Sequence, residues 1–266
     1  MNSSERLTTD GKLKMDPVFI KNGAELVYTV QETPTQLSLM RLKLADRSVE
    51  RLHPQALTNE FEIAFSPDER YCAFVQSRAN LNLKLVIRDL KEGKEAVFDP
   101  GAGFAGMRHP TIFGNRVVFS IPAGNGQLLQ SVNLQAGDRK SLPGTGLNHW
   151  PAFSPDGKRL AFGSSKDGDF EIYTMDPEGG NVTRLTHSPG LDMRPAWSPD
   201  GKRLAFISNR DGRYEAYVMQ ADGAGVQRLT NHPERDDYPA WHPDGKRLAL
   251  VSERDGQFDL YLLPVP

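Results

Sequence analysis

A repeat of 44 residues constrains the fold of this sequence more than any other feature. Residues 151–186 and 195–230 are nearly superposable, and both begin with Pro-Ala, an aromatic residue and Ser-Pro-Asp-Gly-Lys-Arg-Leu-Ala-Phe. A third copy begins at Pro239, so successive copies start 44 residues apart. Repeats of this length are typical of proteins in which each unit is one supersecondary structure that buries its apolar face against its neighbours.

Three further copies are more divergent and bring the total to six. The Ser-Pro-Asp at 66–68 lies 88 residues before Ser154 and its neighbours, which is two repeat lengths, and degenerate copies begin at Pro17 and Pro110. Six units of this length occupy nearly all of the 266 residues. The apolar residues that precede each crossover recur at intervals of 43–45 residues, at Leu7, Leu52, Val97, Leu142, Leu185 and Leu229.

Each repeat carries the sequence signals of four short β-strands. A first strand ends at Pro-Asp-Gly, where Pro suits the first central position of a type I turn and Gly supplies a left-handed residue. In the fourth repeat an apolar run follows at 159–163, and Asp-Gly at 167–168 marks the next hairpin. An aromatic-rich strand and a short Val-Thr-Arg-Leu-Thr strand complete the unit. This pattern predicts an all-β, six-bladed β-propeller with four antiparallel strands per blade.

The two ends of the sequence together supply one complete repeat. The last copy reaches Pro266 after its third strand, while the Arg-Leu-Thr at 6–8 matches the Arg-Leu-Thr at 184–186. We therefore expect residues 4–9 to form the outer strand of the last blade, covering an edge that would otherwise stay unpaired. The chain is expected to be a single domain, residues 1–266, with blades at 16–54, 60–99, 108–143, 149–187, 193–231 and 237–266 plus 4–9.

Charge and composition exclude several classes of function. The 32 Lys+Arg and 34 Asp+Glu leave a net charge of −2, without the basic excess that a nucleic-acid surface requires. No apolar run approaches the roughly 20 residues of a membrane-spanning helix, and no hydrophobic signal segment follows Met1. We therefore expect no nucleic-acid partner, no membrane insertion and a cytoplasmic location, or a periplasmic one if a signal was removed. The single Cys72 excludes an intrachain disulfide and is expected in the core.

The candidate binding residues lie just before the first strand of each blade. In a propeller these positions gather around the mouth of the central channel, and here they differ in every blade while the turn and core residues repeat. Since the fold does not require their identities, we predict a binding site that combines aromatic rings, imidazoles, guanidinium groups and carboxylates. The predicted channel-mouth residues are Asp16, Glu62, Arg108, His109, His149, Trp150, Arg194, Asp237 and Tyr238.

Catalytic and cofactor motifs are scarce. The sequence contains no G-x-S-x-G nucleophile elbow. A G-x-G-x-x-G match at 101–106 is followed by a proline and a strand, and not by the helix that would bind a nucleotide phosphate. We predict no cofactor, no catalytic residue and no metal, with a weaker alternative in which His109, His149 and a neighbouring carboxylate bind a divalent ion. Asp192 and Asp236 recur three residues before a strand-one proline, and we interpret them as structural.

The repeat pattern resembles a known family. Its segments SPDGKRLAF, RDG, EIY and RLT are similar to the WD40-like (PD40) repeats of TolB-type six-bladed β-propellers, and the resemblance extends over residues 6–266. The resemblance implies a scaffold that binds a protein, peptide or cell-envelope partner. Complete TolB-type proteins also carry an N-terminal α/β domain and a secretion signal. The resemblance extends to the propeller portion alone. Some propeller lyases with similar repeats hold a metal through channel imidazoles.

Two classes of function follow from these observations. The leading hypothesis is a non-enzymatic, monomeric binding propeller that presents its channel mouth to a protein or peptide partner, or alternatively to a small anionic ligand. The competing hypothesis is a small channel-site enzyme, a lyase or hydrolase that acts on an anionic carbohydrate. In that enzyme Arg108 and Arg194 would hold carboxylates, and His109 or His149 would transfer the proton.

Overall fold

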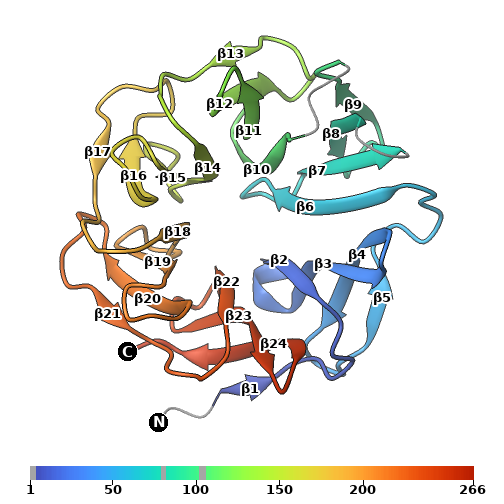
Figure 1. Ribbon diagram of the computed structural model, residues 1–266. Coiled ribbons are helices and arrows are strands. Elements are labelled where there is room, and N and C mark those ends of the chain that lie inside the picture. Colours follow the sequence, from blue (N-terminus) through green and yellow to red (C-terminus); the bar gives the residue numbers. More distant parts are fainter. Residues whose placement is uncertain (1–3, 79–81, 102–105) are drawn as a thin grey trace.

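Six four-stranded sheets surround a common centre in the computed structural model (Figure 1). The structure describes residues 4–78, 82–101 and 106–266, so most of the G-x-G-x-x-G match lies outside the described residues. Neighbouring strands within each sheet are antiparallel. The predicted all-β, six-bladed propeller is therefore confirmed.

The strands of a blade follow one another from the centre of the ring to its rim (Figure 1). Blade one contains β2 (Lys14–Ile20), the short 3-10 turn η1 (Lys21–Gly23), β3 (Glu25–Thr33), β4 (Gln36–Lys43) and β5 (Val49–Arg51). Blade two contains β6 (Asn59–Phe65), β7 (Tyr71–Arg78), β8 (Asn82–Asp89) and β9 (Glu95–Phe98). Blade three contains β10 (Arg108–Phe113), β11 (Arg116–Ala123), β12 (Gly126–Asn133) and β13 (Lys140–Ser141).

The last three blades correspond to the three close sequence repeats. Blade four contains β14 (Asn148–Phe153), β15 (Leu160–Ser164), β16 (Glu171–Met175) and β17 (Thr183–Arg184). Blade five contains β18 (Asp192–Trp197), β19 (Arg203–Ser208), β20 (Glu215–Gln220) and β21 (Gln227–Arg228). Blade six contains β22 (Asp236–Trp241), β23 (Arg247–Arg254), β24 (Gln257–Pro264) and, at its rim, β1 (Glu5–Arg6).

The Ser-Pro-Asp-Gly turn between the first two strands is held by its own side chains. In blade four the Ser154 hydroxyl donates to Asp156 at 2.6 Å, and the backbone N–H of Lys158 donates to the same carboxylate at 3.1 Å. Gly157 has a φ of +69°, and a Cβ at this position would lie 2.0 Å from the ring of Phe113. The turn therefore requires glycine both for its left-handed backbone and for its contact with the preceding blade.

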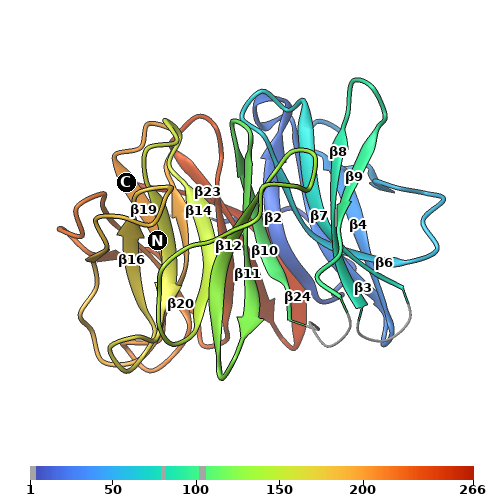
Figure 2. The same ribbon diagram turned by 90° about the horizontal axis from the view of Figure 1, so that it is seen from above.

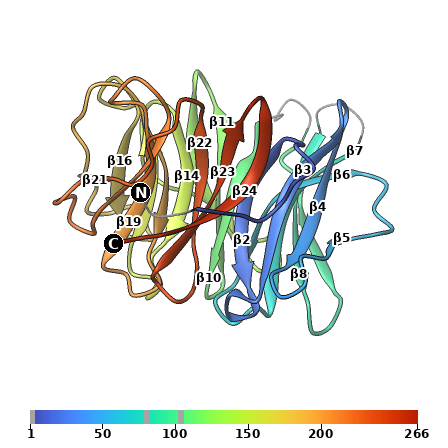
Figure 3. The same cartoon turned by 90° about the horizontal axis from the view of Figure 1, so that it is seen from below.

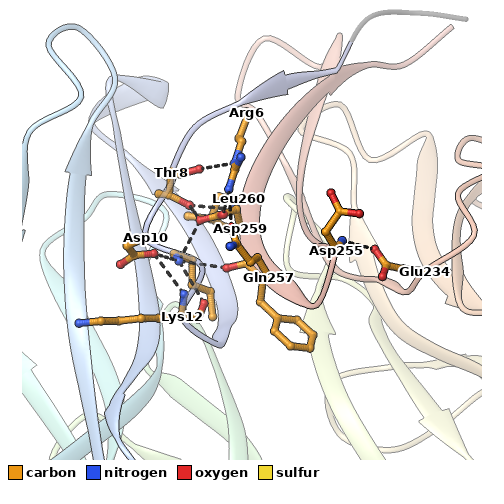
Figure 4. Close-up of polar contacts among 11 residues, drawn as sticks. Arg6, Thr8, Asp10, Lys12, Glu234, Asp255, Gln257, Asp259 and Leu260 are labelled. Carbon is orange, nitrogen blue, oxygen red and sulfur yellow. Dashed lines mark hydrogen bonds and ion pairs between the residues drawn. The ribbon is translucent and has the colours of Figure 1, made fainter.

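Residues from the two ends of the chain pair in blade six, as the sequence predicts. Arg6 in β1 is opposite Tyr261 in β24, so the described strand Glu5–Arg6 is shorter than the expected 4–9 segment. Just beyond β1, the Leu7 N–H donates to the Leu260 carbonyl at 2.7 Å, and Leu7 packs in a core cluster between blades six and one. Arg6 and Thr8 also contact Asp259 (Figure 4). The N-terminal strand thus closes the ring.

Repeated aromatic side chains join neighbouring blades. The Trp197 indole N–H of blade five donates to the Ala152 carbonyl of blade four at 3.0 Å, and the Arg159 guanidinium carbon lies 4.4 Å from the Trp197 ring centroid. Trp241 makes the same kind of hydrogen bond to blade five, at 3.1 Å. Between blades six and one, Phe19 takes the equivalent place and packs edge-on against His242.

Seen edge-on, the strands run between the two faces of the ring (Figures 2 and 3), and β1 and the C-terminus lie at its rim (Figure 1). Cys72 is buried in the core of blade two, as the sequence predicts. Among the described residues, no helix is long and apolar enough to cross a membrane. The innermost strands β2, β6, β10, β14, β18 and β22 surround the centre, where the candidate site lies (Figure 1).

Candidate functional site

Each innermost strand carries one residue with a left-handed backbone. These residues have φ between 48° and 57°, and each lies where the register with the second strand shifts, for example between His149 and Ala152. Left-handed conformations are unusual for bulky side chains, and a bulge turns a side chain away from the regular alternation. The six residues are Asp16, Glu62, His109, Trp150, Arg194 and Tyr238.

The six left-handed residues surround one cavity of about 160 Å³ on the axis of the ring. The residues that follow them, five prolines and Ile63, complete the lining. The other three predicted residues lie one position earlier in the chain and contact the lining residues: Arg108 pairs with Glu62, His149 packs on Trp150, and Asp237 lies against Arg194. The structure therefore brings all nine predicted residues into one connected cluster.

Glu62 is the most strongly held carboxylate of the cavity. Its side chain is 3% exposed, and it binds the Arg108 guanidinium and accepts the backbone N–H of His109 at 2.6 Å. Burial alone would raise the pKa of Glu62, but the neighbouring His109 imidazole, Arg108 and these hydrogen bonds bring the pKa below its ordinary value. Glu62 is thus a fixed negative charge that positions blade three against blade two.

Asp16 lies in blade one, adjacent to the blade of Glu62, and its carboxylate has a different environment. Its carboxylate makes no hydrogen bond with any residue in the described part of the chain, and Arg194 Nη1 lies 3.8 Å from its Oδ1. Burial raises the pKa of Asp16 to about 7, and the negative charge of Glu62 adds to this effect while Arg194 and Arg108 oppose it. Asp16 is therefore a carboxyl group that titrates near neutral pH inside the channel.

Arg194 is stacked between two aromatic rings from the adjacent blades. Its guanidinium carbon lies 3.8 Å from the ring centroid of Tyr238 and 5.2 Å from that of Trp150. Its Nε lies 2.8 Å from Oδ1 of Asp237, which also binds Arg235. The arrangement combines cation–π contacts with an ion pair and holds the guanidinium in one place.

The two imidazoles belong to an aromatic cluster from blades three and four, which also contains Trp150. The rings of His109 and His149 are 5.8 Å apart and nearly perpendicular, and each packs against Trp150. Burial lowers the pKa of His109 to about 3 and that of His149 to about 4, so both rings are neutral at pH 7. Their Nδ1 atoms and Trp150 Nε1 are buried without a hydrogen-bond partner among the described residues.

Two residues of the cluster carried no usable sequence signal. Phe170 packs 5.3 Å from Trp150, but its position is also aromatic in blades five and six and therefore looked like part of the repeat. Arg235 binds Asp237 from two residues earlier in the chain, outside the positions considered for the mouth. Over residues 4–78, 82–101 and 106–266, no group of three His, Cys, Asp or Glu side chains is arranged to hold a metal ion.

Asp192 and Asp236 are buried at the interfaces between blades and do not line the cavity. Asp192 accepts hydrogen bonds from Ser188 and from Arg210, the latter at 2.7 Å, and Asp236 binds the Ser252 hydroxyl. These contacts agree with the interpretation of the two aspartates as structural.

The architecture and its central site define a class, the β-propellers built from WD40-like repeats. Within that class, the model of the TolB beta propeller domain (PD40) matches residues 133–265, and the chain belongs to this family.

Comparison with known proteins gives relatives of differing function. An uncharacterized protein from Agrobacterium fabrum is 35% identical over 78 residues, which are 29% of this chain and 23% of that protein. TolB from Acinetobacter baumannii is 22% identical with a TM-score of 0.73, over 92% of this chain and 64% of TolB. Oligogalacturonate lyase from Vibrio parahaemolyticus is 16% identical with a TM-score of 0.64, over 100% of this chain and 94% of the lyase.

These likenesses differ in what they support. The chain spans less than two thirds of the length of the TolB structure, and the curated relative matches over less than a quarter of its own length. At identities of 22% and 16%, the two structural matches establish the fold alone. The function must therefore be argued from the side chains of the cavity.

Proposed function

We propose that this chain is a binding propeller whose channel mouth receives part of a protein or peptide partner. One observation carries this proposal: six bulky or charged residues, one per blade, adopt left-handed backbone conformations and direct side chains of different chemistry into one cavity. The repeated turns, cores and blade interfaces make their contacts elsewhere in the ring.

The backbone strain at these positions is a physical reason to expect a role beyond folding. A left-handed conformation costs a residue other than glycine about 1 kcal/mol or more. Six such residues together approach the total stability of a typical domain, which is about 5–15 kcal/mol. Glycine or asparagine would adopt this backbone more readily than Trp150, Arg194 or Tyr238. Six of the fourteen residues other than glycine with positive φ in the described part of the chain line this one cavity, and such conformations are frequent at binding and catalytic sites.

The size and lining of the cavity favour the binding of a small part of a larger partner. About 160 Å³ accommodates a side chain or a chain end, and is below the roughly 300–1,000 Å³ of sites that enclose a whole drug-sized ligand. Trp150, Tyr238 and Arg194 belong to the residue types that contribute most to binding energy at protein interfaces. A segment of a partner could thus anchor one group in the channel while the rest lies on the mouth.

A channel-site enzyme is a second candidate, and one observation favours it. The Asp16 carboxyl titrates near pH 7 in a cavity that also contains the neutral imidazole of His109, as a general acid or base would require. The lyase or hydrolase hypothesis assigns Arg108 and Arg194 to the substrate's carboxylates. Both guanidinium groups already lie close to a carboxylate, so a substrate carboxylate would have to compete with Glu62 at Arg108 and to share Arg194 with Asp237.

Selection from a random peptide library against the whole chain tests the binding function. Peptides that bind the wild type should lose at least about tenfold in affinity with Trp150→Ala or Tyr238→Ala, because large aromatic anchors are removed. The double variant His109→Ala/His149→Ala should retain most of the affinity. Turnover of an acidic oligosaccharide that is abolished in the double variant, together with no selected peptide, would favour the enzyme instead.

A further inference from the structure

The charged groups of the channel differ in whether they already have a partner. Arg108 is bound to Glu62, and Arg194 Nε lies 2.8 Å from Asp237. Asp16 is the exception, because its carboxylate makes no hydrogen bond within the described ranges and its contact with Arg194 is 3.8 Å long. Among the described residues that line or support the cavity, every guanidinium has a close carboxylate, whereas the one ion pair of Asp16, with Arg194, is 3.8 Å long.

This inventory distinguishes between ligands of opposite charge. The imidazoles of His109 and His149 are neutral at pH 7, because burial lowers the pKa values to about 3 and about 4. An anionic ligand would have to share a guanidinium that already lies close to Glu62 or Asp237, and would place a second negative charge beside that buried carboxylate. A cationic ligand at Asp16 would compete only with the 3.8 Å ion pair to Arg194, whose guanidinium also lies against Asp237.

We propose that the partner group bound in the channel is a primary ammonium, held by the carboxylate of Asp16. This inference rests on the proposed binding function and names the chemistry that the site recognises. Asp16 on β2 and Trp150 on β14 belong to blades on opposite sides of the ring (Figure 1), so the stem of the ligand passes between carboxylate and indole. A volume of about 160 Å³ holds an ammonium with a few methylene groups.

The state of Asp16 makes this binding depend on pH. The pKa of Asp16 is raised to about 7, chiefly by burial and also by Glu62 and Asp237, with Arg194 and Arg108 opposing the shift. The ammonium binds the ionised form, whose fraction increases about tenfold between pH 6 and pH 8 for a group of this pKa. Both imidazoles remain neutral over this interval, so affinity should rise with pH through the titration of Asp16.

Three probes of similar size and different charge test the inference on the whole chain: n-butylammonium, butyrate and 1-butanol. We expect butylammonium to bind the wild type at pH 8 at least tenfold more tightly than the other two, and about tenfold more weakly at pH 6. The preference should disappear in Asp16→Asn and persist in the matched control Asp169→Asn, which alters an exposed carboxylate. Asp16→Glu should restore part of the preference.

Peptides separate the two sources of an ammonium. One arm uses an N-acetylated peptide with a single internal lysine, and the other uses a lysine-free peptide with a free N-terminus. Tighter binding of butyrate, no binding of butylammonium, or an unchanged preference in Asp16→Asn would each overturn the inference. A selected peptide that loses affinity with Trp150→Ala but not with Asp16→Asn would leave the binding function standing and refute the ammonium alone.

Discussion

Lys14 is the most unusual single residue of the ring. It is fully buried, and its Nζ lies 3.1 Å from Asp259 and 3.1 Å from the Phe258 carbonyl. The equivalent positions three residues before the strand-one proline are Asp192 and Asp236 in blades five and six. At the interface between blades one and six, the repeated aspartate is thus replaced by Lys14, which lies opposite Asp259. The charges at this interface are complementary.

Replacing Lys14 should be strongly destabilising. Lys14→Met removes one partner of a buried ion pair, and we expect the free energy of unfolding to fall by about 3–5 kcal/mol. Urea denaturation measures this change. Lys84→Met is the matched control: Lys84 pairs with Asp99 at 2.7 Å, but both side chains are exposed, so its effect should be below about 1 kcal/mol. Equal effects of the two substitutions would contradict this account of ring closure.

Asp236 should make stability depend on pH in the direction opposite to that of most carboxylates. Burial raises its pKa to about 6, with the hydrogen bond from Ser252 opposing the effect and the charge of Glu215 adding to it. Between about pH 4 and pH 6 the native state therefore binds more protons than the unfolded state, and this contribution to stability is lost as pH rises.

The variant Asp236→Asn removes this titration. The wild type loses stability between pH 4 and pH 7 as Asp236 ionises, and the variant does not. The unfolding free energy of the variant minus that of the wild type should therefore increase by up to about 3 kcal/mol over this interval, which corresponds to a pKa shift of some two units. Urea denaturation at both pH values measures the difference. A difference that stays constant with pH would show that Asp236 has no raised pKa in the native state.

At the level of the elements, β1 has an importance out of proportion to its two paired residues. It covers the edge of β24, and the adjacent Leu7 is 4% exposed in the core between blades six and one. Arg6 and Thr8 supply two of the hydrogen-bond donors of the buried Asp259 (Figure 4). The segment therefore pairs with the edge strand β24, buries Leu7 in the core and donates hydrogen bonds to the buried Asp259.

Deletion of residues 1–10 should lower the melting temperature by about 10 °C or more, because the loss of several kcal/mol moves the midpoint by roughly 2–4 °C per kcal/mol in a chain of this size. Leu7→Asp, which keeps the chain length, should also lower it. Lys12→Ala, an exposed substitution just beyond the deleted segment, should leave the midpoint unchanged. An unaltered melting curve for the deletion would refute closure by β1.

The elements could be predicted from the sequence because the repeat specifies them at fixed positions. Pro-Asp-Gly and Asp-Gly mark the turns, and the match between residues 6–8 and 184–186 reveals which strand completes the ring. The candidate site could be predicted from the same repeat, because residues that differ between copies at one position of the repeat are not determined by the fold. The positions that differ between copies include the six residues that line the cavity and three residues that contact this lining.

Other properties of the site depend on contacts between blades and could not be predicted. The stacking of Arg194 between Trp150 and Tyr238 depends on the angle between neighbouring blades, which no single repeat encodes. The left-handed backbone of these residues also has no sequence signal, because none is glycine or asparagine. The buried pair of Lys14 and Asp259 was visible only as a departure from the repeated aspartate, and its meaning required the ring to be closed.

For the whole molecule, the ring is a frame that brings six different side chains to one point. Neighbouring blades are joined by recurring contacts, such as the indole hydrogen bonds of Trp197 and Trp241, while the axis has a different residue in each blade. A ligand in the channel would therefore touch all six blades at once. We propose that the partner is recognised on this axis and not at the rim or the blade interfaces.

The three tryptophans provide the most direct test, through the indole N–H signals in a nitrogen-15 NMR spectrum, assigned with Trp→Phe variants. Trp150 lines the cavity and its N–H has no partner among the described residues, whereas the indoles of Trp197 and Trp241 are hydrogen-bonded between blades. On titration with a selected peptide, we expect a saturable shift of the Trp150 signal and stationary signals for the other two. A stationary Trp150 signal with a bound peptide would contradict this proposal.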